Sequence, residues 1–257
     1  MPIELERENG TAVVIVDRPE ALNALDLEHL EILRDRLEQV AADEETRVVV
    51  LTGAGDKAFV AGADIKYMHG LGVLEARSWS ELGHRVGELL ETMRKPTIAS
   101  INGYALGGGC ELALACDLRL ASSTAKIGQP EISIGILPGW GGSQRLARAT
   151  TLGFAKELVL TGRMVDAAEA LERGLVNAVY EPTELRSKTR ELSKALAAKS
   201  GLALAYAKEA ANLPLQGNHR QNLETEVRLF SMLFASEDQK EGMGAFIEKR
   251  RPEFQNR

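Results

Sequence analysis

Two glycine-rich segments, NGYALGGGCELALACD at residues 102–117 and GQPEISIGILPGWGG at residues 128–142, carry more information than any other part of the chain. Glu111 follows a run of three glycines at an expected helix start, and Glu131 follows a Gly-Gln-Pro turn. Bare glycine backbone lets a substrate carbonyl approach N–H groups at a helix N-terminus, where donors and dipole favour negative charge. Two carboxylates beside such a site predict acid–base chemistry through an enolate.

Each glutamate also has a purely structural interpretation. An acidic side chain in the first helical turn is stabilised by the helix dipole, and Glu often follows a Pro at the first helical position. Residues 112–116 are all apolar, however, which indicates that Glu111 lies at a buried helix end. A buried carboxylate is costly unless it is paired or functional. We therefore favour a functional role for the pair Glu111 and Glu131.

Length and composition predict a globular protein. The 257 residues suffice for one large domain, or one domain with a helical appendage. Hydrophobic residues make up 44% and charged residues 26%, close to globular averages. The first twenty residues do not resemble a secretory signal, and no apolar stretch is long enough to span a bilayer. We expect a cytoplasmic protein without a membrane partner.

Metal and nucleic-acid sites are not expected. Cys110 and Cys116 would point to different faces of one helix, which argues against a disulfide between them. The four histidines lie far apart, with no HExxH or Cys-x-x-Cys motif, so no metal site is predicted. A net charge of -6 argues against a general nucleic-acid surface.

Hydrophobic periodicity predicts alternating strands and helices. Leu30, Leu33 and Leu37 recur at helical spacing, whereas residues 48–51 are a continuous apolar run typical of a buried strand. We expect strands at 3–8, 11–16, 47–52, 97–101 and 118–121, and helices at 27–42, 75–93 and 108–115. Residues 53–62 are expected to form a glycine-rich loop. This order predicts an α/β fold with parallel strands whose active loops lie at the strand ends.

The composition changes near residue 181. Helices are expected at 184–199, 202–212, 220–234 and 237–249. We divide the chain into residues 1–195, a core with the active site, and residues 196–257, a helical region. Apolar residues such as Val227, Phe230 and Phe234 indicate that this region packs on the core or on another subunit.

Other catalytic templates do not fit the chain. No GxGxxG or P-loop motif occurs, which argues against dinucleotide and nucleotide binding. The EISIG segment at residues 131–135 has Glu where the GxSxG elbow of serine hydrolases needs Gly.

Several motifs together strongly resemble the enoyl-CoA hydratase (crotonase) family. They are AFVAGADI at residues 58–65, the segment 102–117 and QPEISIGILPGWGGSQRL at residues 129–146. The similarity extends from DRPEALNAL at residues 17–25 to GMGAFIEKRRPEF at residues 242–254. It implies a crotonase-like spiral of ββα turns, followed by a C-terminal helical region that builds homotrimers, usually paired into homohexamers.

The resemblance also implies roles for individual residues. Glu111 and Glu131 match the two catalytic glutamates, and the backbone N–H groups of Ala63 and Gly108 match the oxyanion hole. Further implied contacts are Gly139 to the attacking water, and Ala61, Lys66, Phe246 and Lys249 to CoA. In many relatives the last two come from a neighbouring subunit.

The acyl pocket is expected to involve Met68 and Trp140. Trp140 stands where many relatives carry a smaller side chain, so we expect it to narrow the pocket toward short acyl chains. Residues 67–80, which include Met68, are expected to line the same pocket.

The implied activity is the reversible syn hydration of 2-trans-enoyl-CoA thioesters to 3-hydroxyacyl-CoA. CoA is part of the substrate, and no separate cofactor is expected. Two close carboxylates in a poorly solvated site should share a proton and titrate as a coupled pair. The alternatives are an enoyl-CoA isomerase or another acyl-CoA enzyme of the family. Related isomerases often keep only the carboxylate matching Glu131, so the presence of Glu111 favours a hydratase. An RNA-binding member of the family is disfavoured by the acidic net charge.

Overall fold

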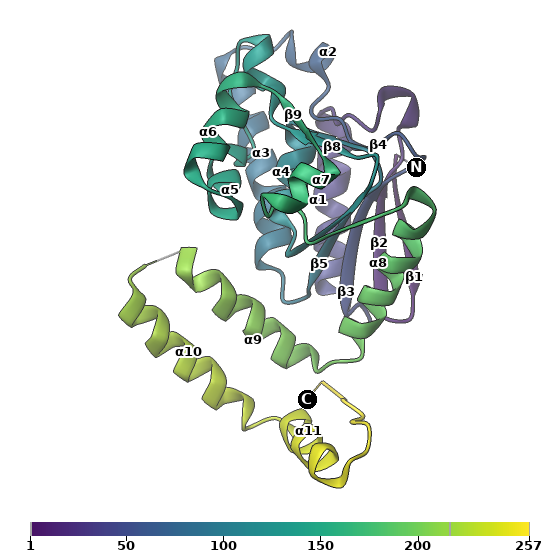
Figure 1. Cartoon of the computed structure of the whole chain (residues 1–257), viewed down its shortest axis with the longest axis vertical. Helices are drawn as coiled ribbons and strands as arrows, with labels where there is room; N and C mark the ends of the chain where they lie inside the picture. The colour runs from purple at the N-terminus through teal and green to yellow at the C-terminus, as the bar shows by residue number, and fades with distance from the viewer. Residues whose placement is uncertain (1, 216, 257) are drawn as a thin grey trace.

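The larger of two β-sheets contains six strands in the order β1-β2-β3-β5-β7-β10 (Figure 1). The computed structural model describes residues 2–215 and 217–256. The six strands are β1 Ile3–Glu8, β2 Thr11–Val16, β3 Val48–Gly53, β5 Thr97–Ile101, β7 Leu118–Ser122 and β10 Ala178–Tyr180. β1 pairs antiparallel with β2 across Asn9 and Gly10, both with positive φ (48° and 76°), as a two-residue hairpin turn requires. The other neighbours pair parallel, as predicted.

The two faces of this sheet contribute to different apolar clusters. Val49 and Leu51 of β3 belong to the main core with α1 (Leu27–Ala42) and α3 (Val73–Thr92). Val48 and Val50 point to the opposite face, where they pack with Leu185 of α8 (Pro182–Ala197). Because successive side chains of a strand alternate between faces, the continuous apolar run is explained by burial on both sides.

A second sheet contains four short strands in the order β4-β6-β8-β9. They are β4 Ala58–Val60, β6 Tyr104–Leu106, β8 Lys126–Gly128 and β9 Met164–Asp166. The expectation of a loop over residues 53–62 was therefore wrong, because β4 lies inside it. Strands of three residues are too short to show alternation in the sequence, and their partners are distant along the chain.

Successive turns of the chain contribute one strand to each sheet and then a helix. The repeated units are β3-β4-α3, β5-β6-α4 and β7-β8-α5, with α4 at Gly108–Ala115 and α5 at Gly142–Ala149. This is the ββα spiral that the resemblance implies. β4, β6 and β8 run parallel, so the residues that follow them, Ala61, Gly107 and Gln129, meet at one edge of the small sheet.

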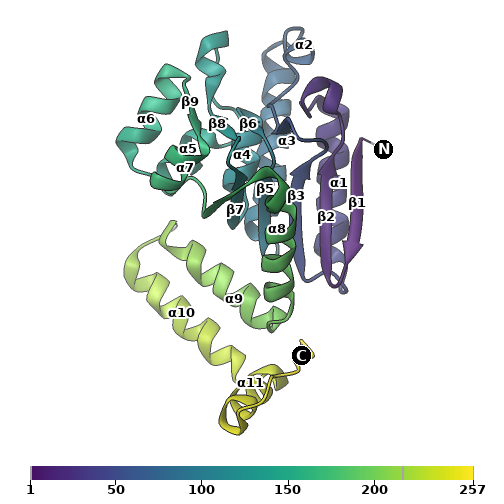
Figure 2. The same cartoon turned by 45° about the vertical axis from the view of Figure 1, so that its right-hand side comes forward.

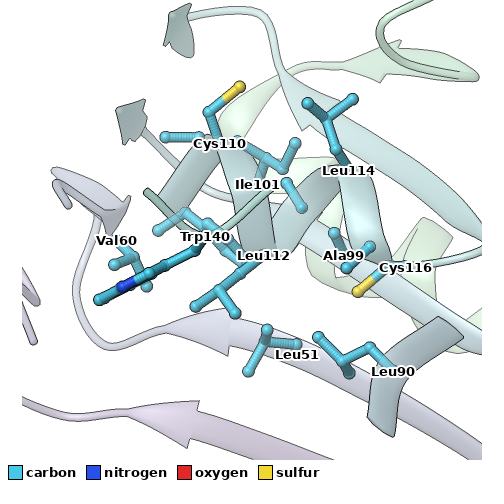
Figure 3. Packing of buried hydrophobic residues seen from close by; sticks show 14 of the residues in the cluster. Leu51, Val60, Leu90, Ala99, Ile101, Cys110, Leu112, Leu114, Cys116 and Trp140 are labelled. Atoms are coloured by element: carbon cyan, nitrogen blue, oxygen red, sulfur yellow. The ribbon is translucent and has the colours of Figure 1, made fainter. Parts of the chain in front are cut away.

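Helix α4 crosses β4 at very close range. A Cβ on Gly109 would lie only 1.8 Å from the Val60 carbonyl oxygen, so this position requires glycine. Figure 3 shows Cys110, Leu112 and Leu114 of α4 packed among strand residues, with Trp140 close to Val60. Cys110 and Cys116 are buried free thiols, and burial raises the pKa of each.

The remaining elements complete the core and form the C-terminal helical region. They are α2 Ile65–Met68, α6 Leu152–Thr161, α7 Ala167–Glu172, α9 Gly201–Asn212, α10 His219–Leu233, α11 Glu237–Glu248 and the 3₁₀ turns η1 Pro19–Ala21, η2 Pro130–Ile134 and η3 Leu213–Leu215. The four helices predicted beyond residue 181 are confirmed to within two residues at each end.

Helices α9 and α10 lie side by side and extend away from both sheets (Figure 2). One attachment to the core is Lys208 of α9, whose Nζ donates to Leu90 O and pairs with Asp117, both at 2.8 Å. The division at residues 195 and 196 falls in the last turn of α8, which packs on the large sheet. The two-part organisation stays a prediction.

Candidate active site

A cavity of about 670 Å³ opens where β4, β6 and β8 end. Its lining combines the residues after these strands with residues of α2, α3 and the segment that follows η2. Among the lining residues are the predicted site positions Ala61, Ala63, Met68, Gly108, Glu111, Glu131, Gly139 and Trp140. Tertiary structure therefore brings together residues that are distributed over 80 positions of the sequence, from 61 to 140.

Glu111 lies in the first turn of α4 and is 2% exposed. One carboxylate oxygen, Oε1, accepts hydrogen bonds from the backbone N–H of Trp140 at 2.7 Å and of Gly142 at 2.6 Å. Burial raises the pKa of Glu111, while these two donors and the positive charge of Arg145 act in the opposite direction. The sequence predicted the burial but indicated neither the donors nor this cation.

Glu131 lies in η2, directly after Pro130, and is 9% exposed. A Cβ on Gly107 would lie 3.0 Å from Glu131 Oε1, so glycine at 107, with φ +51°, makes room for the carboxylate. Gln129 is fully buried. When its side-chain amide is oriented with the nitrogen toward Glu131, this nitrogen donates to Glu131 Oε1 at 2.8 Å. Burial, and next the negative charge of Glu111, raise the pKa of Glu131 to about 7. Near neutral pH this carboxyl can therefore hold or release a proton.

We expect Glu131→Gln to raise the melting temperature more at pH 8 than at pH 5. The folded-state pKa of Glu131, about 7, lies above its ordinary value of 4.5, so the folded protein binds this proton more tightly than the unfolded chain. The free energy of unfolding of the wild type consequently falls as pH rises through 7, by at most about 3 kcal/mol. A glutamine at this position does not ionise, so the variant does not show this decrease. Thermal melts at both pH values measure it, with Glu44→Gln on the exposed surface as control. Equal shifts at the two pH values would contradict the expectation.

The Ala63 and Gly108 amides lie at the wall of this cavity. The carbonyl of Gly62 accepts from Leu25 N at 2.9 Å, so in a trans peptide the Ala63 N–H points away from Leu25. The carbonyl of Gly107 accepts from Glu111 N at 3.0 Å, so the Gly108 N–H points away from the helix. A Cβ on Gly62, whose φ is +107°, would lie 3.8 Å from Gly108 N, which places the two segments next to each other.

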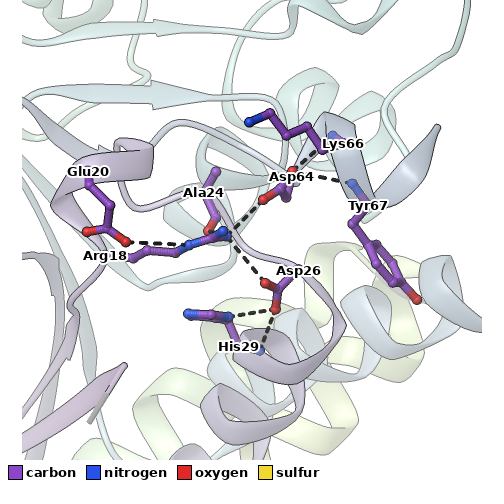
Figure 4. A network of polar contacts seen from close by, with 8 residues as sticks. All are labelled: Arg18, Glu20, Ala24, Asp26, His29, Asp64, Lys66 and Tyr67. Atoms are coloured by element: carbon purple, nitrogen blue, oxygen red, sulfur yellow. Dashed lines mark hydrogen bonds and ion pairs between the residues drawn. The ribbon is translucent and has the colours of Figure 1, made fainter. Parts of the chain in front are cut away.

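An ion-pair network immobilises the chain next to Ala63 (Figure 4). Arg18 Nη1 donates to Asp64 Oδ2 at 2.9 Å and to Ala24 O at 3.1 Å, and it lies 3.4 Å from Asp26 Oδ2. Asp64 in turn caps α2 by accepting from the backbone N–H of Lys66. Arg18 and Asp64 are 46 residues apart, so the sequence did not indicate this contact.

Comparison with known proteins places the chain in a family. A family model described as enoyl-CoA hydratase/isomerase matches residues 6–257. The chain belongs to this family. A crotonyl-CoA hydratase of Syntrophomonas wolfei is 46% identical over 252 residues, covering 98% of this chain and 97% of the relative. A short-chain-enoyl-CoA hydratase of Clostridium acetobutylicum is 46% identical over 254 residues, with the same coverage. The crystal structure of an enoyl-CoA hydratase from Bacillus anthracis aligns with a TM-score of 0.97 at 38% identity, covering all of both chains.

Three predicted CoA contacts of this enoyl-CoA hydratase/isomerase family member lie outside the cavity. Lys66 is exposed on α2, next to the ion-pair network of Figure 4. Phe246, 84% exposed, and Lys249 belong to the α11 end of the helical region, far from α2 and α4 in Figure 1. Within one chain neither of these two joins the site, so their roles stay predictions.

Aromatic rings form one wall of the cavity in this protein. The ring centroids of Trp79 and Trp140 are 5.2 Å apart, and those of Tyr67 and Trp79 are 5.1 Å apart. Trp140 fits because a glycine faces it from each of two helices: a Cβ would lie 2.3 Å from its ring at Gly108 and 2.1 Å at Gly83. The ring thus fills space directly beside Glu111, whose carboxylate the Trp140 backbone binds.

Residues 2–215 and 217–256 contain neither a metal-binding cluster nor a membrane-spanning helix. No group of three or more His, Cys, Asp or Glu side chains is arranged to hold a metal ion in this part of the chain. No helix within the same residues combines the length and the apolar character needed to cross a membrane.

Proposed function

We propose that the protein catalyses the reversible syn hydration of 2-trans-enoyl-CoA thioesters to 3-hydroxyacyl-CoA. The observation that carries this proposal is the pair of buried carboxylates, Glu111 and Glu131, in one cavity beside the Ala63 and Gly108 amides. The names of the relatives from Syntrophomonas wolfei and Clostridium acetobutylicum support it. The presence of both glutamates favours hydration over isomerisation.

The thioester carbonyl oxygen would accept hydrogen bonds from the N–H groups of Ala63 and Gly108. Negative charge grows on this oxygen as water adds at C3, because the intermediate is an enolate of the thioester. Donors placed in advance for such an oxygen are worth about 3 to 4 kcal/mol each in other enzymes. The position of Gly108 at the start of α4 adds the positive end of a helix dipole.

The carboxylate pair supplies the proton transfers. One glutamate accepts a proton from the water that attacks C3, and a proton is delivered to C2, so one water is consumed for each double bond. The pair works while it holds one shared proton, which fits the rise in the pKa of Glu131 to about 7 beside Glu111. The Gly139 N–H would help to hold the water. Because both carboxylates would lie on one face of the alkene, both new bonds form on that face.

CoA binding would use Ala61 at the adenine and Lys66 at the phosphates. Phe246 and Lys249 would reach the CoA of a neighbouring subunit, which requires a homotrimer or a homohexamer. The exposed rings of Phe230 on α10 and of Phe234, directly after this helix, have centroids 5.1 Å apart and support a subunit contact. The cytoplasmic location expected from the sequence stays a prediction.

We expect Phe230→Asp to shift the protein from trimer or hexamer toward monomer. A charge at the centre of an apolar contact is costly because it loses its hydration on burial. Sedimentation velocity measures the change, and Phe230→Leu, which keeps the position apolar, serves as control. A wild-type protein that sediments as a monomer at micromolar concentration would contradict the proposed assembly.

We expect a preference for short acyl chains, and we expect Trp79→Leu to relax it. Trp79 packs against Trp140 and lines the cavity, so a smaller side chain extends the space for the acyl group. The ratio of kcat/KM for 2-decenoyl-CoA to that for crotonyl-CoA should rise about tenfold. Trp79→Phe, which keeps an aromatic ring, should change the ratio less. An unchanged ratio in Trp79→Leu would show that the aromatic wall does not limit chain length.

The loss of enoyl-thioester absorbance with crotonyl-CoA tests the proposed function. We expect rapid loss with 3-hydroxybutyryl-CoA as the product, identified by chromatography. No loss with the folded wild-type protein would overturn the proposal for this substrate and direct attention to isomerase substrates, longer or branched acyl groups, and RNA.

A further inference from the structure

Arg145 lies directly behind the turn that binds Glu111. Its Nη1 donates to the carbonyl oxygen of Trp140 at 2.6 Å, and the side chain is almost completely buried. The N–H groups of Trp140 and Gly142, in the same turn, donate to Glu111 Oε1 at 2.7 and 2.6 Å. The turn from Trp140 to Gly142 is therefore bound on one side by the Arg145 guanidinium, through a carbonyl oxygen, and binds the Glu111 carboxylate on the other side, through its N–H groups.

The guanidinium is itself held by Glu91, at the end of α3. Arg145 Nε donates to Glu91 Oε1 at 2.8 Å, and Nη2 donates to Oε2 at 2.7 Å. Two parallel hydrogen bonds of this kind fix the plane of a guanidinium as well as its position. Asn212 of α9 donates to the Glu91 carbonyl at 3.2 Å, which fixes this end of α3 from the other side.

Two glycines make room for the Arg145 side chain. A Cβ on Gly87 would lie 2.8 Å from Nη2, and a Cβ on Gly141 would lie 2.4 Å from Nη1. Gly141 has φ +103°, a conformation that lets the N–H groups on either side of it converge on one oxygen. Glycines on α3 and in the turn thus leave the space that this guanidinium occupies.

We propose that Arg145, held by Glu91, is a positioning residue that keeps the turn from Trp140 to Gly142 in place around the Glu111 carboxylate. This inference rests on the proposed function, because its kinetic test uses hydration. A displacement of a reacting group by about 1 Å can lower a rate about 100-fold. Arg145 touches no reacting atom, so its effect passes through Glu111.

The charges around Glu111 give the proposal a pH-dependent readout. Arg145 on α5 is the cation that lowers the pKa of Glu111, and Glu131 on η2 is the neighbouring carboxyl. Glu91 of α3 pairs with the Arg145 guanidinium, and His84 of the same helix lies close to the turn, with its Cε1 3.6 Å from a Cβ built on Gly141. Removal of the cation should therefore raise the pKa of Glu111 and move the acidic limb of the kcat/KM profile to higher pH.

The kinetic test compares Arg145→Met and Arg145→Lys with a matched control. Arg119→Met removes another largely buried arginine, which donates to the carbonyl oxygens of Leu175 and Cys116, both at 2.7 Å. We expect Arg145→Met to lower kcat about 10- to 100-fold with little change in KM. Arg145→Lys should keep the acidic limb near its wild-type position and recover part of the rate. Arg119→Met should leave kcat and the pH profile unchanged.

Hydrogen exchange supplies a second readout that does not depend on activity. In Arg145→Met, the amides of Trp140 and Gly142 should exchange faster, whereas Arg119→Met should leave them protected. Wild-type kcat, pH profile and exchange in Arg145→Met would overturn the inference. If the wild type hydrates no crotonyl-CoA, the proposed function fails. Faster exchange in Arg145→Met would then still support the positioning contact, and unchanged exchange would overturn it.

Discussion

Glu111→Gln and Glu131→Gln are each expected to lower kcat for crotonyl-CoA hydration by about 1,000-fold or more. General acid–base catalysis contributes roughly 100- to 10,000-fold per group, and here the two groups share one proton. Glutamine keeps the size and one acceptor oxygen of each side chain but can neither accept nor release the proton. The KM for crotonyl-CoA should change much less than kcat, because the proposed thioester contacts come from backbone amides.

The double variant sharpens this expectation. If the glutamates act as a unit, combining the substitutions should cost little more than either one alone. Initial rates of absorbance loss measure all three variants, with Glu44→Gln as the matched surface control and thermal melts to establish folding. More than a tenth of wild-type kcat in either folded single variant would show that the shared-proton mechanism is wrong.

One added methyl group at Gly109 is expected to prevent normal folding. A Cβ there would lie 1.8 Å from the Val60 carbonyl oxygen and 2.9 Å from the Val60 side chain. Neither partner can move easily, because β4 pairs with β6 and α4 is buried along its whole length. Overpacking typically costs about 1 to 3 kcal/mol, and a backbone collision of this kind should exceed that range. Displacement of α4 would also move Glu111.

Gly153→Ala is the matched control for this substitution. Gly153 also lies in a helix, α6, and a Cβ there would meet no atom within 4 Å. The soluble yield and the melting temperature should fall sharply for Gly109→Ala and stay near wild type for Gly153→Ala. A Gly109→Ala protein that melts within a few degrees of wild type would contradict the account of α4 packing.

The long elements could be predicted because their side chains repeat a clear pattern. Leu30, Leu33 and Leu37 follow a helical period, and Gly, Pro or Ser residues separate the successive helices of residues 182–248. The small sheet could not be predicted from periodicity. Its three-residue strands are too short to alternate visibly, and pairing between β4 and β6 joins residues more than forty positions apart.

In the candidate site, too, residues could be identified from their own segment, but contacts between segments far apart in the sequence could not. Glu111 and Glu131 were found because each lies in a short segment of unusual composition. The donors and charges that control them were not found. Arg145 lies 34 positions from Glu111 and resembles any other helical arginine in the sequence, and only the folded chain shows its contact with Glu91.

The sequence by itself determined the carboxylate pair, the glycine positions and the order of the long elements, because these depend on residue type and local spacing. Tertiary structure alone decided which backbone N–H groups donate to Glu111. It also decided that burial and the charge of Glu111 raise the pKa of Glu131. Both depend on burial and on distances between segments that the chain brings together only when it is folded. Hydrogen bonds and charge interactions act over a few ångströms of space, and separation along the sequence does not reveal that distance.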